Sequence, residues 1–309
     1  MWVYSIPTRT RFRGLIRREG ILFRGEAGWG EFSPFPQYGP FDSARWLAAA
    51  EESAHRGWPS PLRNTVPVNA TIPAVDPATA YAMTAASGCR TAKVKVAERV
   101  QHEAADIARV RAVRAALGTH GLLRVDANGA WDVDTALRMI KALNQFDLQY
   151  VEQPCATLAE LAAVRRRTDV PIAADESVRR AEDPLRVRLA DAADIVVLKV
   201  QPLGGVRAAL RVADACGLPV VVSSALETSI GLSAGLALAA ALPELPYACG
   251  LATLSLLEGD VVADSLVPVD GEIRLRRPVP DEDLLRRSRP LDPAVTAAWY
   301  RRMTEARPR

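Results

Sequence analysis

The sequence predicts an α/β protein: a modified TIM-type (β/α) barrel that carries a smaller α+β capping domain. Short β-branched runs ending in a polar residue alternate with helical stretches rich in alanine and arginine, and successive run ends lie 23 to 31 residues apart. That spacing fits one strand, one helix and two loops per unit. Eight parallel strands of this kind favour a closed barrel. The alternative is a doubly wound open sheet, which lacks support because no GxGxxG follows any strand.

The first 65 residues have a different pattern. Runs at 2–7, 14–24 and 29–32, joined by turns with Gly and Arg, predict antiparallel strands, and 41–56 predicts a helix. The tail is rich in Pro and Arg, and 271–275 predicts a strand that returns to the first domain. We therefore expect a capping domain over residues 1–65, to which 266–309 return, and a barrel over 66–265.

Eight runs predict the barrel strands. They are 67–72, 91–96, 122–126, 150–152, 171–175, 195–199, 220–223 and 248–251. The stretches between them have helical periodicity, with apolar residues on one side and arginines elsewhere. The clearest predicted helices are 103–117, 133–143, 158–167 and 229–242, and Gly118 and Gly217 are plausible helix ends.

Composition excludes several classes of protein. The 309 residues hold 39 basic and 36 acidic side chains, which argues against a nucleic-acid surface. The longest mostly apolar run, 230–242, is too short to cross a bilayer, and no secretory signal opens the chain. The four cysteines form no CxxC pair, and the three histidines have no ligand spacing. We expect a soluble cytoplasmic protein with no nucleic-acid or membrane partner.

Acidic residues end three successive predicted strands: Asp126, Glu152 and Asp175. The carboxyl ends of barrel strands meet at one face, so these side chains should converge. Three carboxylates at one point repel one another unless a cation lies between them. Oxygen ligands without His or Cys favour Mg²⁺, with Mn²⁺ as the alternative. Three solvated acids at loop starts would be the simpler interpretation, but all three close apolar runs.

Lysine is scarce, since only four of the 39 basic residues are lysines. Lys93, Lys95 and Lys199 lie at strand ends that flank the three acids, whereas Lys141 lies within a predicted helix. Arginine stays charged and cannot act as a base. A lysine beside another cation has a lowered pKa and can accept a proton. The pattern predicts proton abstraction next to a carboxylate, with the metal stabilising the developing charge.

These motifs together resemble one family. The set, in order, is Lys93-Val94-Lys95, Asp126-Ala127-Asn128, Glu152-Gln153-Pro154, Asp175-Glu176-Ser177 and Lys199. It resembles the enolase superfamily, in its muconate-lactonising subgroup, and the N-terminal segment is similar to the capping domain of that subgroup. The resemblance implies Mg²⁺ held by Asp126, Glu152 and Asp175, with Lys95 and Lys199 on either side of a small carboxylate substrate.

Further stretches resemble those subgroup members that dehydrate a succinyl-hydroxycyclohexadiene carboxylate in menaquinone biosynthesis. They are 28–34, 124–128, 223–228 and 250–251. The resemblance implies that Lys95 takes the α-proton and returns it to the leaving hydroxyl, while Lys199 stays cationic. It also implies supporting or substrate-binding roles for Lys93, Arg124, Asn128, Ser223, Ser224 and Gly250. The loop 9–13 would close over the substrate.

Other reactions remain open on the same scaffold. Racemisation of N-succinylamino acids would use the same two lysines, and muconate lactonisation is a weaker rival. The dipeptide epimerases of the subgroup carry an Asp-x-Asp where this chain has 250–252, and mandelate-racemase relatives need a histidine that 223–228 lacks. A barrel without catalysis, used for binding alone, is a further alternative. The sequence leaves the oligomeric state open.

Overall fold

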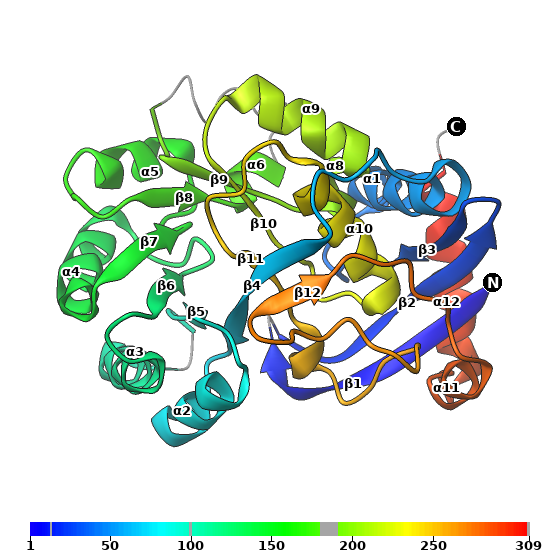
Figure 1. Cartoon of the computed structure of the whole chain (residues 1–309), viewed down its shortest axis with the longest axis horizontal. Helices are drawn as coiled ribbons and strands as arrows, with labels where there is room; N and C mark the ends of the chain where they lie inside the picture. Colours follow the sequence, from blue (N-terminus) through cyan, green and yellow to red (C-terminus); the bar gives the residue numbers. More distant parts are fainter. Residues whose placement is uncertain (13, 99–100, 180–190, 308–309) are drawn as a thin grey trace.

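Eight parallel strands surround the centre of the larger domain (Figure 1). The computed structural model describes residues 1–12, 14–98, 101–179 and 191–307. The strands follow the order β10-β9-β8-β7-β6-β5-β4-β11, and a bridge between Ser223 and Gly250 brings β10 to β11, so the ring nearly closes. The strands are β4 (Thr65–Ile72), β5 (Thr91–Lys95), β6 (Leu122–Asp126), β7 (Leu148–Glu152), β8 (Ile172–Ala174), β9 (Ile195–Leu198), β10 (Val220–Val222) and β11 (Cys249–Ala252). The predicted barrel and its eight strands are confirmed.

Helices follow the strands and cover the outside of the barrel. They are α2 (Pro77–Ala86), α3 (Glu103–Leu117), α4 (Val133–Leu143), α5 (Leu158–Arg165), α6 (Glu176–Arg179), α8 (Val200–Leu203), α9 (Val206–Cys216) and α10 (Ser229–Ala241), with 3-10 turns η2 (Asn144–Phe146) and η3 (Leu254–Leu256). Local chemistry sets their limits: Thr157 and Glu160 form a capping box at α5, and Gly118 and Gly217 end α3 and α9 with positive φ. No described helix is long and apolar enough to cross a membrane.

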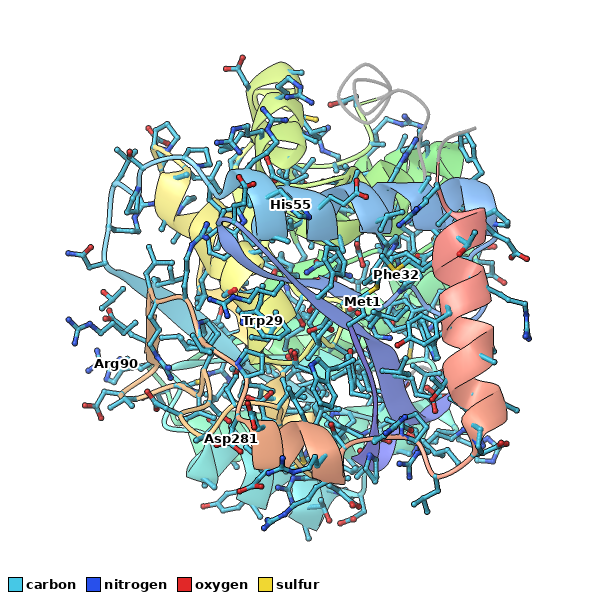
Figure 2. All side chains as sticks on the ribbon, turned by 90° about the vertical axis from the view of Figure 1, so that its right-hand side faces the viewer. Met1, Trp29, Phe32, His55, Arg90 and Asp281 are labelled. Carbon is cyan, nitrogen blue, oxygen red and sulfur yellow. The ribbon has the colours of Figure 1, made fainter. Side chains whose placement is uncertain are left out.

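The N-terminal segment forms a separate antiparallel sheet in the order β1 (Trp2–Phe12), β2 (Leu15–Gly25), β3 (Gly28–Phe32). Helix α1 (Pro40–Glu51) packs on β3 and continues as a π-helical turn, η1 (Glu52–Arg56). The C-terminal helix α12 (Pro293–Glu305) returns to this sheet, where Trp299 and Met303 join a core with Val3 and Phe32. Figure 2 views the molecule from this side, with α1 and α12 against the sheet.

The strand expected at 271–275 returns to a different place. It forms β12 (Glu272–Arg274), followed by α11 (Glu282–Arg287), and pairs antiparallel with β4 from Thr65 to Pro67, not with the N-terminal sheet. The pairing of β4 with β5 begins only at Ala70, so the first residues of β4 have a free edge that β12 fills. The expectation that this strand joins the sheet of the capping domain was wrong.

Two buried charged residues of the capping sheet hold it to the barrel. Arg18 donates from Nε to the carbonyl of Leu226, at 2.7 Å. The Glu31 carboxylate accepts from the backbone N–H groups of Thr228 (3.2 Å) and Gly231 (3.0 Å), at the start of α10. The unpaired N–H groups and the dipole of a helix N-terminus favour a carboxylate there. The capping sheet therefore fixes the loop that follows β10.

A second carboxyl group, Glu227, is buried beside Glu31. A Cβ on Gly231 would lie 2.6 Å from the Cβ of Glu227 and 3.0 Å from the Cδ of Glu31, so glycine makes room for both side chains. Burial and the charge of Glu31 raise the pKa of Glu227 to about 7, and Arg18 only partly offsets them. The folded protein therefore holds a proton on Glu227 that the unfolded chain has lost at neutral pH.

The Glu227 carboxyl should make the fold less stable as the pH rises. Its pKa is higher in the fold than the ordinary value of 4.5, so stability falls between about pH 5 and pH 8 as the folded protein loses this proton. Glu227→Gln should remove this dependence and gain about 1–3 kcal/mol over wild type between those pH values. Urea unfolding at several pH values measures it.

The exposed residue Glu282 on α11 offers the matched control, since Glu282→Gln should follow wild type across the same range. A Glu227→Gln curve that runs parallel to wild type at all pH values would contradict the buried-proton interpretation.

Candidate active site

The three strand-end carboxylates meet at one mouth of the barrel. Strand register places Lys95 beside Asp126 and Asp126 beside Glu152, and Asp175 directly follows β8. All three carboxylates have no solvent exposure. The predicted convergence of Asp126, Glu152 and Asp175 with the strand-end lysines is thus present in the structure.

Each carboxylate is paired with a lysine. Lys93 Nζ lies 2.9 and 2.8 Å from the two oxygens of Glu152. Lys199 Nζ lies 2.6 Å from Asp175 Oδ2. Lys95 donates to Asp126 and, at 2.9 Å, to Asn128 Oδ1. The three lysines therefore approach the carboxylates from β5 on one side and from the end of β9 on the other.

The carboxylates influence one another strongly. Burial, together with the charges of Asp126 and Asp175, raises the pKa of Glu152 to about 7, although Lys93 acts against this. Burial would also raise the pKa of Asp126, but Lys95 and Lys93 outweigh it and hold this pKa well below its usual range. The three acids therefore share one electrostatic environment.

The expectation of a lowered pKa is wrong for Lys93. Burial does disfavour its charge, but Glu152 and Asp126 more than compensate and raise the pKa of Lys93. A lysine beside carboxylates responds to them more than to the neighbouring lysine. Lys93 is therefore a structural cation of this site.

The donor set fits a hard divalent cation. Three buried carboxylate oxygen donors on adjacent strands, with no His or Cys, match Mg²⁺ or Mn²⁺. The raised pKa of Glu152 indicates that positive charge is short among these acids. Within the described residues no three such side chains already form a metal cage, because the lysines draw them apart into ion pairs.

The free space beside the lysines is about 20 Å³. Its walls include Phe12 and Phe35 from the capping domain and the loop after β10. The Phe12 ring lies 5.6 Å from Lys95 Nζ, within the range of a cation–π contact. Phe12 belongs to the loop expected at 9–13, in which Arg13 lies outside the described residues. The capping domain thus supplies part of the wall.

Ser223 and Ser224 both line this cavity, whereas Gly250 supports them from behind. Ser224 Oγ lies 2.7 Å from the hydroxyl of Thr253, and the N–H of Ser224 donates to the carbonyl of Gly250 at 3.0 Å. A Cβ at Gly250 would lie 2.5 Å from Ser223 Oγ. Gly250 therefore allows β10 and β11 to approach.

Arg124 lies deeper than a substrate contact would require. Its guanidinium donates to Gln149 (2.7 Å) and to the carbonyl of Ala248 (2.7 Å), near the beginnings of their strands, and lies over the rings of Tyr150 and Tyr247. It is fully buried and does not line the cavity. Arg124 shares the inward face of β6 with Asp126, two residues further along, so it forms the floor beneath the site.

Asn128 positions the lysine rather than the cavity wall. It accepts from Lys95 and donates to Glu176 Oε1 at 3.3 Å. Its φ is +48°, a strained value that is common at functional sites. The motif following Asp126 thus turns back to hold Lys95.

Sequence reasoning missed two residues that organise the acids. Arg179 donates to Asp175 Oδ1 (3.0 Å), and to Tyr38 of the capping domain. Gln153, with φ of +40°, accepts from the backbone N–H of Asp175 at 2.9 Å. Gln153 stands in the quoted Glu-Gln-Pro motif, and Arg179 follows Asp175 by one helical turn, so spacing alone could have suggested both.

Comparison with known proteins agrees with this geometry. The family described as "Enolase C-terminal domain-like" matches residues 77–281, and "Enolase N-terminal domain-like" matches residues 3–54. A relative from Thermobifida fusca named o-succinylbenzoate synthase is 67% identical over 304 residues, which cover 98% of this chain and 95% of the relative.

Two solved structures share the fold at low identity. A muconate lactonizing enzyme from Pseudomonas fluorescens aligns with a TM-score of 0.79 and 23% identity, over 94% of this chain and 97% of that one. An N-succinyl Arg/Lys racemase from Bacillus cereus aligns with a TM-score of 0.78 and 20% identity, over 93% and 96%. The chain belongs to the enolase superfamily and, within it, to the family of enzymes named o-succinylbenzoate synthase.

Proposed function

We propose that this enzyme dehydrates 2-succinyl-6-hydroxy-2,4-cyclohexadiene-1-carboxylate to o-succinylbenzoate, as a step of menaquinone biosynthesis, in the cytoplasm. The observation that carries the proposal is the placement of Lys95 and Lys199 on opposite sides of three buried carboxylates. The name of the relative from Thermobifida fusca supports the choice of substrate. The substrate is a small carboxylate whose α-proton must be removed.

Asp126, Glu152 and Asp175 would hold Mg²⁺, or Mn²⁺ in its place. When bound, the metal supplies positive charge that stabilises the substrate carboxylate as negative charge develops on it. Such a cation would compete with the lysines for the three carboxylates. Lys95 and Lys199 would then be released from their ion pairs toward the substrate.

Lys95 would act as the base and then as the acid. Its neutral Nζ takes the α-proton, the C–H electron pair moves into the ring, and the same Nζ returns the proton to the departing hydroxyl as the C–O bond breaks. Water and the aromatic product leave, and the lysine is restored. One group serving both steps requires the proton and the hydroxyl to lie on the same face. Lys199, still protonated, would stabilise the negative charge from the other side.

Racemisation of N-succinylamino acids is the second candidate. It needs a proton donor and acceptor on opposite faces of one carbon, and Lys95 and Lys199 supply such a pair. The racemase from Bacillus cereus shares the fold at 20% identity, which leaves its reaction an alternative.

A direct assay separates the two reactions. We expect Mg²⁺-dependent formation of o-succinylbenzoate from the cyclohexadiene, with kcat/KM well above that for racemisation of N-succinylamino acids. Absorbance of the aromatic product and circular dichroism of the amino acids measure the two rates, with Mg²⁺, with Mn²⁺ and after chelation. A much higher racemase value would overturn the choice of substrate.

Replacing either active-site lysine by arginine should abolish turnover. In Lys95→Arg the guanidinium cannot accept a proton, which should lower kcat by at least about 10³-fold. In Lys199→Arg the larger planar group would misplace the positive charge. Lys141→Arg on α4, where the side chain is exposed, is the matched control and should keep full activity. Near-normal turnover by Lys95→Arg, with an unchanged thermal midpoint in all three variants, would exclude this mechanism.

Divalent cations should stabilise the fold. Mg²⁺ at 100 times its Kd should stabilise the wild type by about 2.7 kcal/mol, visible as a raised Tm. Asp175→Asn should lose this shift, while Asp134→Asn, at an exposed position on α4, should retain it. Calorimetry with a Mg²⁺ titration tests it, and an equal shift in Asp175→Asn would remove Asp175 from the metal site.

A further inference from the structure

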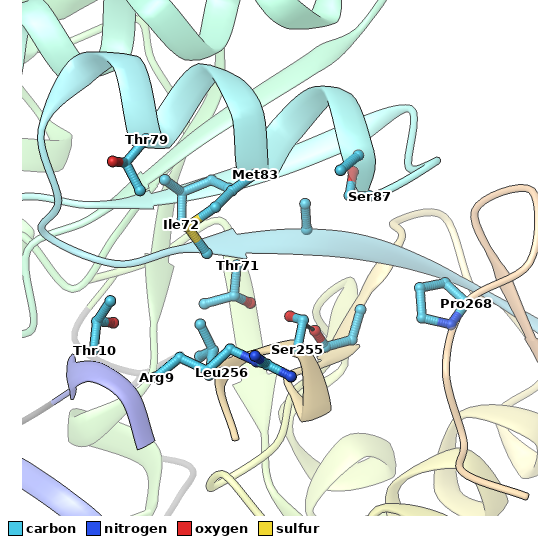
Figure 3. A pocket seen from close by; sticks show the side chains of 13 residues that line it. Arg9, Thr10, Thr71, Ile72, Thr79, Met83, Ser87, Ser255, Leu256 and Pro268 are labelled. Carbon is cyan, nitrogen blue, oxygen red and sulfur yellow. Dashed lines mark hydrogen bonds between the residues drawn. The ribbon is translucent and has the colours of Figure 1, made fainter. Parts of the chain in front are cut away.

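A second cavity, of about 380 Å³, lies next to the lysine cavity (Figure 3). Three elements line both spaces. Strand β1 presents Thr10 to the larger cavity and Phe12 to the lysine cavity, β11 and the residue after it present Ala252 and Thr253 in the same way, and Thr71 of β4 lines both. Only a thin wall, in which Thr71 is common to both sides, therefore separates the two cavities.

The larger cavity has the size of a ligand site, and the smaller does not. Ligand pockets commonly have volumes of about 300–1,000 Å³, whereas a space near 20 Å³ holds roughly one water. A dicarboxylate with a ring and a flexible chain cannot fit beside the lysines alone. Part of such a molecule must lie elsewhere.

Two threonine hydroxyls on the walls of the larger cavity lack a protein partner. Thr71 is 4% exposed, and the Oγ1 atoms of Thr71 and Thr10 make no hydrogen bond within the protein. Other hydroxyls of this cavity differ, since Ser255 Oγ donates to the carbonyl of Ala252 at 3.1 Å and Thr79 Oγ1 to Asp76 at 2.6 Å. A buried hydroxyl without a partner costs stability, so Thr71 is poised for whatever enters the cavity.

The remaining walls indicate the chemistry of the occupant. Ile72, Met83 and Leu256 provide apolar surface, and Figure 3 shows Thr71 pointing from β4 toward Leu256, with the Arg9 side chain running toward Ser255. Arg9 is exposed and, among the described residues, has no ion pair or hydrogen bond. Apolar walls suit methylene groups, while hydroxyls and a guanidinium suit a carboxylate.

We propose that the larger cavity is the subsite for the succinyl arm of the substrate, with Thr71 as its hydrogen-bonding contact at the junction. This inference rests on the proposed function. The ring carboxylate would remain beside Lys95 and Lys199, while the methylenes of the arm lie against Ile72 and Leu256. The terminal carboxylate of the arm would face Thr10 and Arg9. Thr71 would therefore select for substrates that carry such an arm.

Thr71→Val tests the proposal, because valine keeps the shape and removes only the hydroxyl. Calorimetric titration of the Mg²⁺-loaded protein with o-succinylbenzoate should give about tenfold weaker binding than wild type. Benzoate, which lacks the arm, should bind both proteins equally. The Tm should stay the same or rise, because an unpartnered hydroxyl has been replaced by a methyl group. A structural role for Thr71 would instead lower the Tm and weaken both ligands.

Matched variants complete the test. Thr84→Val removes a buried hydroxyl that is already bonded to the carbonyl of Ala80, and it should leave both affinities unchanged. Arg9→Gln should weaken o-succinylbenzoate binding about threefold at low salt, whereas Arg11→Gln, exposed on the same strand and outside the cavity, should not.

Unchanged binding of o-succinylbenzoate by Thr71→Val, or equal weakening of both ligands, would overturn the subsite. A wild type that fails to dehydrate the cyclohexadiene would overturn the proposed function instead. The turnover assay on the wild type therefore separates failure of the reaction from failure of the subsite.

Discussion

Burial of three carboxylates at one end of the barrel is the constraint on which the rest of the site depends. Three negative charges removed from water are tolerable only with nearby cations. Lys93, Lys95 and Lys199 supply that charge, and Arg179 adds a further contact to Asp175. A divalent cation can take over the same role. The site is therefore built so that metal and ammonium groups compete for the same oxygens, and that competition would decide when the amines face a substrate.

The capping domain completes this site through buried polar contacts. Phe12 and Phe35 form walls of the lysine cavity, so the barrel alone would leave it more open to water. Arg18 and Glu31 bind backbone groups of the loop after β10, whose residue Leu226 has a strained φ of +63°. Such a conformation persists only when surrounding contacts hold it. The position of the substrate-facing loop thus depends on the capping sheet.

The sequence was sufficient for features that repeat locally. Strand and helix periodicity predicted the barrel, and the rule that strand ends share one face predicted the meeting of Asp126, Glu152 and Asp175. Long-range partners could not be predicted in this way. The pairing of β12 with β4 depends on which strand edge is free, and the depth of Arg124 depends on its tyrosine neighbours. The Thr71 hydroxyl stands out only because its surroundings leave it without a partner.

The scarcity of lysine follows from a division of work within one barrel. Beneath the carboxylates, Arg124 lies over the ring of Tyr150 and uses several fixed donors at once, a task that suits a planar guanidinium. At the mouth, the ammonium group of Lys95 can leave its carboxylate and lose its proton, which a guanidinium cannot do. The proposed reaction needs a group that changes charge. An arginine-rich sequence that retains lysine at these strand ends is therefore what a proton-transferring barrel of this kind requires.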